Sequence, residues 1–303
     1  MSTLNPARRL AANLSASLSA SRWLPYALFA GLVTMWAYNY VVMKVTLQAA
    51  TPITHLIIRT AIGSLTLFGV LLARGHGIRP QRLRDACQVG LSSNFLYGLA
   101  VTLALVAGAA GRTSVLVFTM PFWVALLSRW LLAEPFSRNA RWAMAAGFAG
   151  LMLTVAPWQL HGGMLPMLCA VLAGLFWALG SVLSKRATQR GQLDSLNFSG
   201  WQALIALLPM LLLLPFADFA GIHWSPAFVL GMVYSGVFSS AVGWLAWLWL
   251  LRRLPASTLS FNSLVIPVLA VGMAAYSLGE WPRTDELLGM LLIGAGIVLI
   301  ARR

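Results

Sequence analysis

The chain has 303 residues, of which 59% are hydrophobic and only 9% are charged, whereas soluble domains carry about 25% charged residues, so an ordinary soluble protein is excluded. The formal net charge of +14 does not indicate nucleic-acid binding, because the basic residues stand singly or in small groups between long apolar runs and form no continuous basic surface. One membrane crossing takes about 20 apolar residues, so the length allows about ten crossings and no sizeable domain outside the membrane.

Residues 1–23 precede the first apolar run and are predicted to form a cytoplasmic N-terminal arm. Arg8 and Arg9, followed by a stretch rich in Leu, Ala and Ser, superficially resemble a secretory signal. Polar residues such as Asn13 and Ser15 interrupt this stretch. We therefore expect the arm to be retained and to lie on the membrane surface.

Ten apolar runs follow, separated by charged residues, prolines and glycines. Backbone polar groups in lipid must be satisfied within the segment, and uninterrupted runs of this length achieve this as helices. The predicted fold class is therefore all-α and polytopic, with ten transmembrane helices. The predicted spans are 24–46, 53–73, 86–108, 113–132, 141–157, 164–184, 196–216, 226–250, 256–279 and 286–301.

The basic residues also predict an orientation, because cytoplasmic loops carry an excess of Lys and Arg. With the N-terminus inside, the opposite side keeps Lys44, Arg112 and Arg283 together with four of the seven acidic residues. We therefore expect both termini in the cytoplasm, and anionic lipid headgroups as partners of the basic side. Sixteen of the 21 basic residues then lie inside, namely Arg8, Arg9, Arg22, Arg74, Arg79, Arg82, Arg84, Arg138, Arg141, Lys185, Arg186, Arg190, Arg252, Arg253, Arg302 and Arg303.

The chain contains an internal repeat. Pro121 and Glu134 recur as Pro267 and Glu280, at an offset of 146 residues. Proline and acidic residues are scarce in this composition, so their shared spacing carries more weight than matches between apolar residues. Further matches at the same offset start from Gly90, Ser93, Leu99, Leu105, Ala110, Ser114, Leu132 and Gly150.

A second register links the beginnings of the two halves. Trp36 and Lys44 match Trp177 and Lys185 at an offset of 141 residues. The halves are 24–157 and 164–303, with five predicted spans each. Because five is odd, the second half crosses the membrane in the opposite sense, as in the inverted repeats of secondary transporters.

Each half therefore carries a proline within a span, then Leu-Leu-Ala-Glu (131–134) or Ser-Leu-Gly-Glu (277–280), and then a last helix that contains glycine. With ten spans in a five-plus-five repeat, this pattern resembles the drug/metabolite transporter superfamily in its ten-helix EamA-type branch. The resemblance covers nearly the whole chain, from about Tyr26 to Ile300.

The resemblance implies a multi-pass exporter of amino acids or related metabolites in a bacterial inner membrane. It also implies a cavity lined by spans 1–4 and 6–9, with spans 5 and 10 packed outside, and the aromatic amino acid exporters are the nearest type. The chain has no Glu in the middle of its first span. This departure from the four-helix multidrug relatives argues against their proton-coupled exchange of cationic drugs.

Two ionisable residues in the second span, His55 and Arg59, are four residues apart and hence share a helix face. An Arg at membrane depth costs roughly 3 kcal/mol or more, so Arg59 should face an aqueous cavity or a partner. It could hold a substrate carboxylate through its planar fork, or it could be a structural arginine bonded to backbone carbonyls. His55 is either a satisfied interfacial histidine or a group that titrates near neutral pH.

Polar and aromatic side chains share one face of the first span, where Trp36, Asn39 and Tyr40 follow helical spacing, and Trp177 and Ser181 occupy the matching face of the sixth span. Such stripes occur both in helix packing and in ligand sites, and both interpretations stay open. Together with the residues below, they could offer ring faces to an apolar side chain and polar groups to an ammonium and a carboxylate. The remaining candidates for substrate binding are Asn94, Tyr97, Phe118, Trp201, Ser240, Trp244 and Asn262.

Pro121 and Pro267 lack the N–H groups that would bond the carbonyls of Val117 and Ser263, so each half is predicted to kink there. The kinks would leave a free carbonyl in each half as a candidate acceptor for a cation.

All seven acidic residues lie at or beyond the predicted helix ends, which disfavours a proton relay through a carboxylate. Uniport and weak proton coupling both stay open. The loops hold no nucleotide-binding motif, and two cysteines are too few for a zinc site or a disulfide framework. We therefore expect no catalytic residue, cofactor, metal or nucleic acid.

The expected function is secondary transport of a small molecule by alternating access. The alternatives are a membrane-embedded enzyme, a passive channel, or an exporter of drugs or other metabolites with the same fold. The sequence leaves the oligomeric state open.

Overall fold

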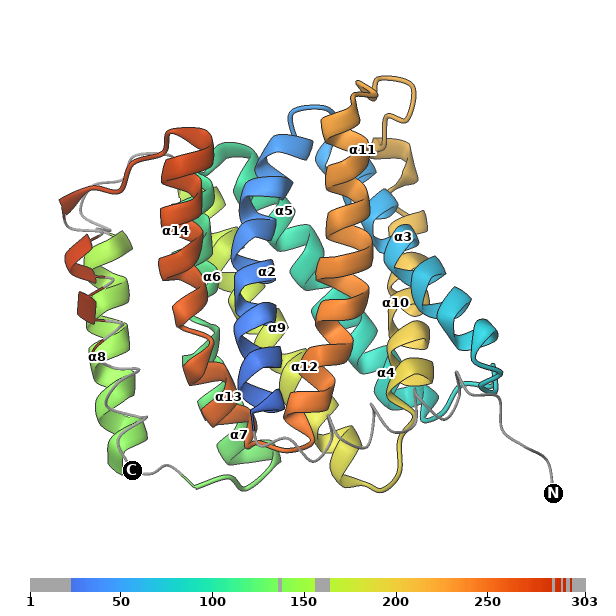
Figure 1. The fold of residues 1–303 in the computed structure, drawn as a ribbon, viewed down its shortest axis with the longest axis horizontal. Helices are drawn as coiled ribbons and strands as arrows, with labels where there is room; N and C mark the ends of the chain where they lie inside the picture. The colour runs from blue at the N-terminus through green and yellow to red at the C-terminus, as the bar shows by residue number, and fades with distance from the viewer. Residues whose placement is uncertain are drawn as a thin grey trace.

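The computed structural model describes residues 23–135, 138–155, 164–284, 287–289, 291–292 and 295. This part of the chain forms a bundle of helices without β-strands (Figure 1). Apart from Trp23, the predicted arm 1–23 lies outside the described residues, and so does most of the predicted tenth span, 286–301.

Nine of the ten predicted spans are helical in the described residues. Those of the first half are α2 (Leu24–Thr46), α3 (Pro52–Ala73), the continuous run of α4 (Leu83–Val89), η1 (Gly90–Leu96) and α5 (Tyr97–Ala107), the pair α6 (Ala110–Val117) and α7 (Met120–Leu131), and α8 (Arg138–Val155). Those of the second half are α9 (Met164–Gln189), α10 (Ser195–Leu211), the run of α11 (Pro226–Val233), η3 (Tyr234–Val242) and α12 (Gly243–Leu251), and the pair α13 (Ala256–Asn262) and α14 (Val265–Leu278).

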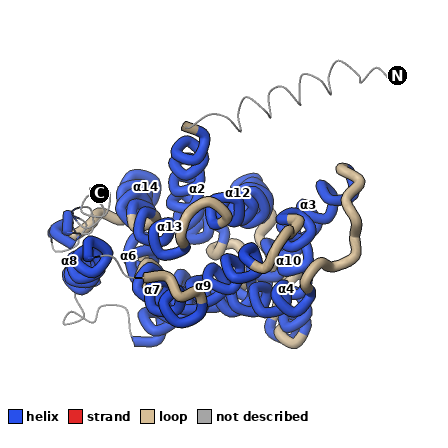
Figure 2. Tube along the Cα trace, turned by 90° about the horizontal axis from the view of Figure 1, so that it is seen from below, coloured by secondary structure: helices blue, strands red, loops and turns tan. Residues whose placement is uncertain are grey.

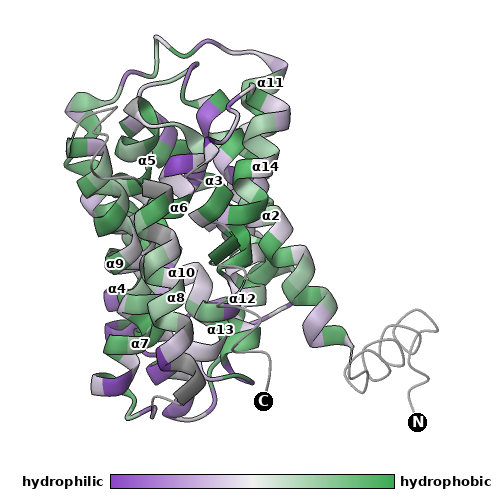
Figure 3. Cartoon of the chain, turned by 90° about the vertical axis from the view of Figure 1, so that its left-hand side faces the viewer, coloured by the Kyte–Doolittle hydropathy of each residue, from purple (hydrophilic) through white to green (hydrophobic). Residues whose placement is uncertain are grey.

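Within the described residues, seven of these helical stretches are long and apolar enough to cross a membrane. The helices α8 and α10, of 18 and 17 residues, match the predicted fifth and seventh spans but are not among these seven. The seventh ends at Leu211, earlier than predicted, and a short 3-10 turn, η2 (Leu214–Phe216), follows it. Hydrophilic residues gather mainly at the two ends of the bundle, and apolar residues cover most of the length between them (Figure 3).

The two halves of the chain interlock. The first helix of the first half, α2, packs against α14, α12 and α11 of the second half, while α9 packs against α5, α6 and α7 of the first. Seen along the bundle in Figure 2, α8 lies at one edge, where it contacts α6 and its Phe148 ring meets Phe122 of α7 at 5.8 Å. The interior of the bundle is thus built from helices of both halves.

Two short π-helical segments interrupt the third and eighth spans at repeat-equivalent positions. The first, η1, ends at Leu96, and the second, η3, ends at Val242, which is 146 residues later. A π-helical turn changes the direction in which the following side chains point, and such turns are frequent at functional sites. No feature of the sequence predicted these segments.

Two lysines cap helix C-termini. Lysine at the C-terminal end of a helix satisfies free carbonyls and interacts favourably with the helix dipole. Lys44 Nζ donates to the carbonyl oxygens of Leu105 (2.9 Å) and Gly108 (2.7 Å), and Lys185 Nζ donates to those of Leu251 (2.5 Å) and Leu254 (2.9 Å).

Two glutamates form the complementary contacts, and these connect the halves. Glu280 accepts a hydrogen bond from the N–H of Ala110 (2.9 Å), at the start of α6. Glu134 accepts from the N–H of Ala256 (3.2 Å), at the start of α13, and from the N–H (3.3 Å) and hydroxyl (3.0 Å) of Ser257. We call the Glu280 contact the upper cap and the Glu134 contact the lower cap, after their places in Figure 1. The repeated glutamate therefore joins each half to the other at one end of the bundle.

Close packing at Gly90 sets the distance between η1 and α10. A Cβ at Gly90 would lie 2.4 Å from the backbone oxygen of Gln202, whereas a Cβ at Gly31 of α2 would meet nothing within 4 Å. Gly90→Ala is therefore expected to destabilise the protein by about 1–3 kcal/mol through overpacking. Gly31→Ala should be neutral or stabilising by about 0.5–1 kcal/mol, because Ala favours helix. Thermal unfolding midpoints in detergent measure this difference, and equal midpoints would contradict it.

Candidate functional site

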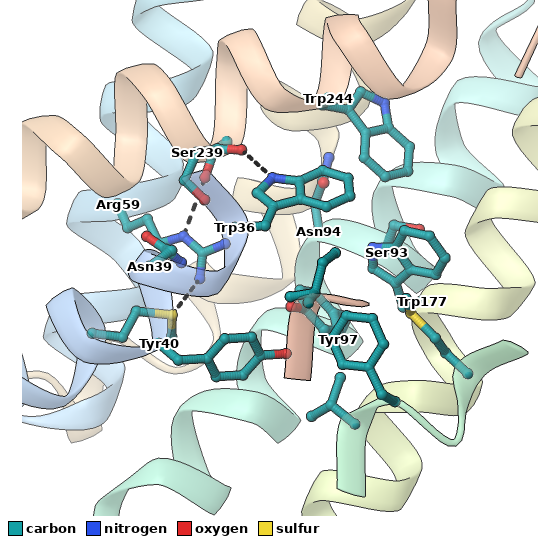
Figure 4. Close-up of a pocket in the computed structure, with 16 residues that line it drawn as sticks. Trp36, Asn39, Tyr40, Arg59, Ser93, Asn94, Tyr97, Trp177, Ser239 and Trp244 are labelled. Atoms are coloured by element: carbon teal, nitrogen blue, oxygen red, sulfur yellow. Dashed lines mark hydrogen bonds between the residues drawn. The ribbon is translucent and has the colours of Figure 1, made fainter. Parts of the chain in front are cut away.

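A cavity lies in the middle of the bundle. Its walls come from both halves of the chain, and Figure 4 shows the side chains that face it. The lining residues are Trp36, Asn39, Tyr40, Met43, Arg59, Ser93, Asn94, Tyr97, Val117, Phe118, Met120, Trp177, Ser239, Ser240, Trp244 and Ile266.

Ten of the fourteen residues predicted for substrate binding line this cavity. They are Trp36, Asn39, Tyr40, Arg59, Asn94, Tyr97, Phe118, Trp177, Ser240 and Trp244. Three lining residues were not predicted, although the sequence pattern could have identified them. Met43 continues the helical stripe of Trp36, and Ser93 and Ser239 are repeat equivalents.

Four predicted residues lie elsewhere. Trp201 points to the connection between α3 and α4, where its Nε1 donates to the carbonyl of Ile78 (2.8 Å) and its ring meets Phe68. Asn262 is the last residue of α13 and is not among the lining residues. For both, the residue type and its predicted span suggested a role in the site but did not identify the neighbouring residues.

The other two are buried beside the cavity. Ser181 accepts a hydrogen bond from Nε1 of Trp247 (3.1 Å), which belongs to the layer behind the cavity wall. His55 is fully buried, and its Nε2 pairs with the hydroxyl of Thr46 (2.9 Å). His55, in the first turn of α3, therefore packs against α2, and its role in titration stays a prediction.

A chain of polar contacts holds Arg59 in place. Its Nε donates to the hydroxyl of Ser240 (3.1 Å) and its Nη1 contacts the sulfur of Met43 (3.4 Å), as the dashed lines in Figure 4 show. Ser240 in turn donates to the carbonyl of Ser235 (2.7 Å), and the Ser235 hydroxyl donates to Asn39 (2.9 Å). These partners of Arg59 are not the backbone carbonyls that a structural arginine would bond.

Charge in the cavity is confined to one side chain. Arg59 is the single charged residue among the lining residues. Within the described residues, neither recorded ion pair involves it, and no group of three or more His, Cys, Asp or Glu could hold a metal there. The cavity can therefore attract one negative group.

Three tryptophans form a cluster at one side of the cavity. Trp36 and Trp177, which are repeat equivalents, meet edge to face with ring centroids 6.1 Å apart. Behind them, Trp247 lies 5.5 Å from the first ring and 4.7 Å from the second. The indole N–H of Trp36 donates to the carbonyl of Ser239 (3.0 Å). Such fixed rings offer a rigid apolar wall with little loss of entropy on binding.

The fourth and ninth spans are both interrupted just before their prolines. Helix α6 ends at Val117 and α7 begins at Met120, while α13 ends at Asn262 and α14 begins at Val265. The first turns of α7 and α14 contribute Met120 and Ile266 to the cavity wall. Because the N-terminus of a helix carries a partial positive charge, both turns favour a negative group in the cavity.

A helical bundle with several membrane-length helices and a central cavity walled by both halves of the chain has the architecture of a membrane transporter. The chain belongs to the EamA-like transporter family, whose model matches it twice, at residues 23–156 and 164–302. The ten-helix membrane fold and the resemblance seen in the sequence are thereby confirmed. The protein is a membrane transporter of this family.

Similar proteins agree with this assignment. The chain is 31% identical to "Uncharacterized transporter YvbV" of Bacillus subtilis, over 90% of each chain. It is 28% identical to "Probable terminal-alkyne amino-acid exporter" of Streptantibioticus cattleyicolor, over 89% of this chain and 91% of the relative. A solved crystal structure has the same fold, with a TM-score of 0.73, 19% identity and coverage of 92% of this chain and 96% of that one.

Proposed function

We propose that the protein exports amino acids with aromatic or other apolar side chains by alternating access between its two inverted halves. The observation that carries this proposal is the division of the cavity between one arginine and a wall of aromatic rings. The name of the Streptantibioticus relative, an amino-acid exporter, supports the substrate class. In this proposal, the predicted halves 24–157 and 164–303 are the units that move.

Arg59 binds the substrate carboxylate. Its Nε is engaged by Ser240, which orients the planar guanidinium, and a planar guanidinium suits a carboxylate because it can donate two parallel hydrogen bonds. The first turns of α7 and α14 add a partial positive charge, which also favours the carboxylate. The apolar side chain then packs against Trp36 and Trp177.

The orientation of the bundle in the membrane follows from the charge of its two ends. We place the end with the lower cap in the cytoplasm, because Arg79, Arg84, Arg190 and Arg253 lie in or beside its connections. With this orientation both termini are cytoplasmic, in a bacterial inner membrane. A membrane-embedded enzyme would need paired acid and base groups, which the lining residues do not supply.

Counterflow in proteoliposomes tests the proposal. Vesicles loaded with unlabelled phenylalanine should accumulate labelled phenylalanine without an imposed pH gradient. Unlabelled leucine should compete, whereas phenethylamine, which lacks the carboxylate, should not. The label must be recovered chemically unchanged, because a changed product would indicate an enzyme. Absence of counterflow with every amino acid, or competition by amines alone, would contradict the proposal and favour an exporter of other metabolites.

A further inference from the structure

A second cavity adjoins the first and extends between α3 and α10. The two share five lining residues, so they lie side by side with Arg59 at the boundary between them. The shared residues are Arg59, Ser93, Asn94, Ser240 and Trp244. Beyond this boundary the walls contain Thr60, Ser199 and Gln202 and no aromatic ring.

Several residues that line this second cavity carry polar atoms without hydrogen-bond partners. Both the amide nitrogen and the amide oxygen of Gln202 lack a partner within the described residues, and so do the hydroxyls of Ser199 and Ser93 and the indole nitrogen of Trp244. Gln202 is 1% exposed and Ser199 is fully buried. A buried polar group without a partner is destabilising, so five such atoms around one space indicate a site for a polar ligand group.

The position of Gln202 depends on close packing. Its backbone oxygen lies against Gly90, the residue where η1 begins. The π-helical turn of η1 brings Ser93 to the border of both cavities. The cluster is therefore held by the fold and does not depend on a loop.

The chemistry of the cluster suits an ammonium group. An ammonium donates three hydrogen bonds, and Gln202 and Ser199 each supply an oxygen that can accept one, while the hydroxyl of Ser93 packs against Gly180 of α9. The adjacent Arg59 would repel an isolated cation, but an α-amino acid places its carboxylate between the two. One zwitterionic head group thus satisfies Arg59 and the cluster at the same time.

We propose that Gln202 and Ser199 form a subsite for the α-ammonium group of the substrate. The head group of the amino acid then lies at the boundary of the two cavities, with its ammonium towards Gln202. Its side chain extends to Trp36 and Trp177. This inference rests on the proposed function, since it assumes that the substrate is an amino acid.

Binding measurements with Gln202→Leu test the subsite. The ligands are phenylalanine and 3-phenylpropionate, which differ only in the amino group, and quenching of the cavity tryptophans in detergent reports binding without transport. The native protein should bind phenylalanine at least about tenfold more tightly than 3-phenylpropionate, because one hydrogen bond to a charged group contributes about that much to the affinity. Gln202→Leu should lower the affinity for phenylalanine by about tenfold and leave the affinity for 3-phenylpropionate unchanged.

Two further variants keep the test decisive. Thr102→Val is the control, because Thr102 is also fully buried with an unpartnered hydroxyl in the described residues, but it lies outside both cavities. It should leave both affinities unchanged. Ser199→Ala, a smaller change, replaces Gln202→Leu if that variant does not fold, and it should again weaken phenylalanine alone.

The outcomes separate the subsite from the proposed function. The proposed subsite is wrong, and the proposed function stands, if the native protein binds the two ligands with equal affinity. The same conclusion follows if Gln202→Leu lowers both affinities to the same extent. If the native protein binds 3-phenylpropionate but not phenylalanine, the proposed function is wrong, and the subsite falls with it.

Discussion

Arg59→Gln is expected to lower the counterflow of phenylalanine at least about 100-fold, because the substrate carboxylate would enter the cavity without a positive partner. Removing one member of a buried charge pair typically costs about 3–5 kcal/mol. Arg59→Lys should be intermediate, because lysine keeps the charge but loses the planar fork. Initial rates over a range of phenylalanine concentrations in proteoliposomes measure both effects.

Substrate preference distinguishes binding from a structural role of Arg59. Phenylalaninamide has no carboxylate, so Arg59→Gln should reduce the preference for phenylalanine over this amide. Arg74→Gln is a matched control, since Arg74 is exposed at the end of the same helix, and it should transport normally. The carboxylate role is wrong if Arg59→Gln, folded and thermally stable, transports phenylalanine as well as the native protein does.

The second prediction concerns the upper and lower caps. Each joins a glutamate of one half to the helix start of the other, and the two contacts are repeat-equivalent. If the cavity opens to alternate sides, opening at one end must break the cap at that end. Glu280→Ala should therefore favour opening at the upper end, and Glu134→Ala should favour opening at the lower end.

Loss of a helix cap costs about 1–2 kcal/mol, so each variant should shift the equilibrium about five- to thirtyfold. A cysteine at Met43, which lines the cavity, reports the shift once Cys87 and Cys169 are replaced by serine. An impermeant maleimide added outside should label this cysteine faster in Glu280→Ala and more slowly in Glu134→Ala.

The double variant supplies the internal control. Because the two losses act in opposite directions, the cysteine at position 43 should be labelled at nearly the native rate in the variant that carries both Glu134→Ala and Glu280→Ala. Shifts of the same sign in both single variants would show that the caps stabilise the bundle without controlling its opening.

Much of the fold could be predicted because membrane helices are local structures. An apolar run of membrane length forms a helix whatever its neighbours are, and the shared spacing of Pro121 and Glu134 with Pro267 and Glu280 revealed the repeat. The role of Glu134 could not be predicted. Its partners, Ala256 and Ser257, are distant in sequence, and two of the three hydrogen bonds come from backbone N–H groups, which leave no trace in the pattern of side chains.

The candidate site divides in the same way. Helical spacing alone placed Trp36, Asn39 and Tyr40 on one face, and that face lines the cavity. Two adjacent residues on α10 show the limit of this approach. Trp201 was predicted to line the cavity, but it bonds Ile78 at the lower end. Gln202 was not predicted, but it lines the second cavity. Spacing within one helix does not state which neighbour each face meets.

The sequence by itself determined that the chain spans a membrane as helices, that it is built from two related halves, and which helix faces are polar. These properties depend on composition and on spacing within single segments. Only the tertiary structure decided that η1 and η3 turn their serines to the interior, that Arg59 meets Ser240, and that unpartnered polar atoms gather around Gln202. These features depend on the packing of distant helices, which no single segment encodes.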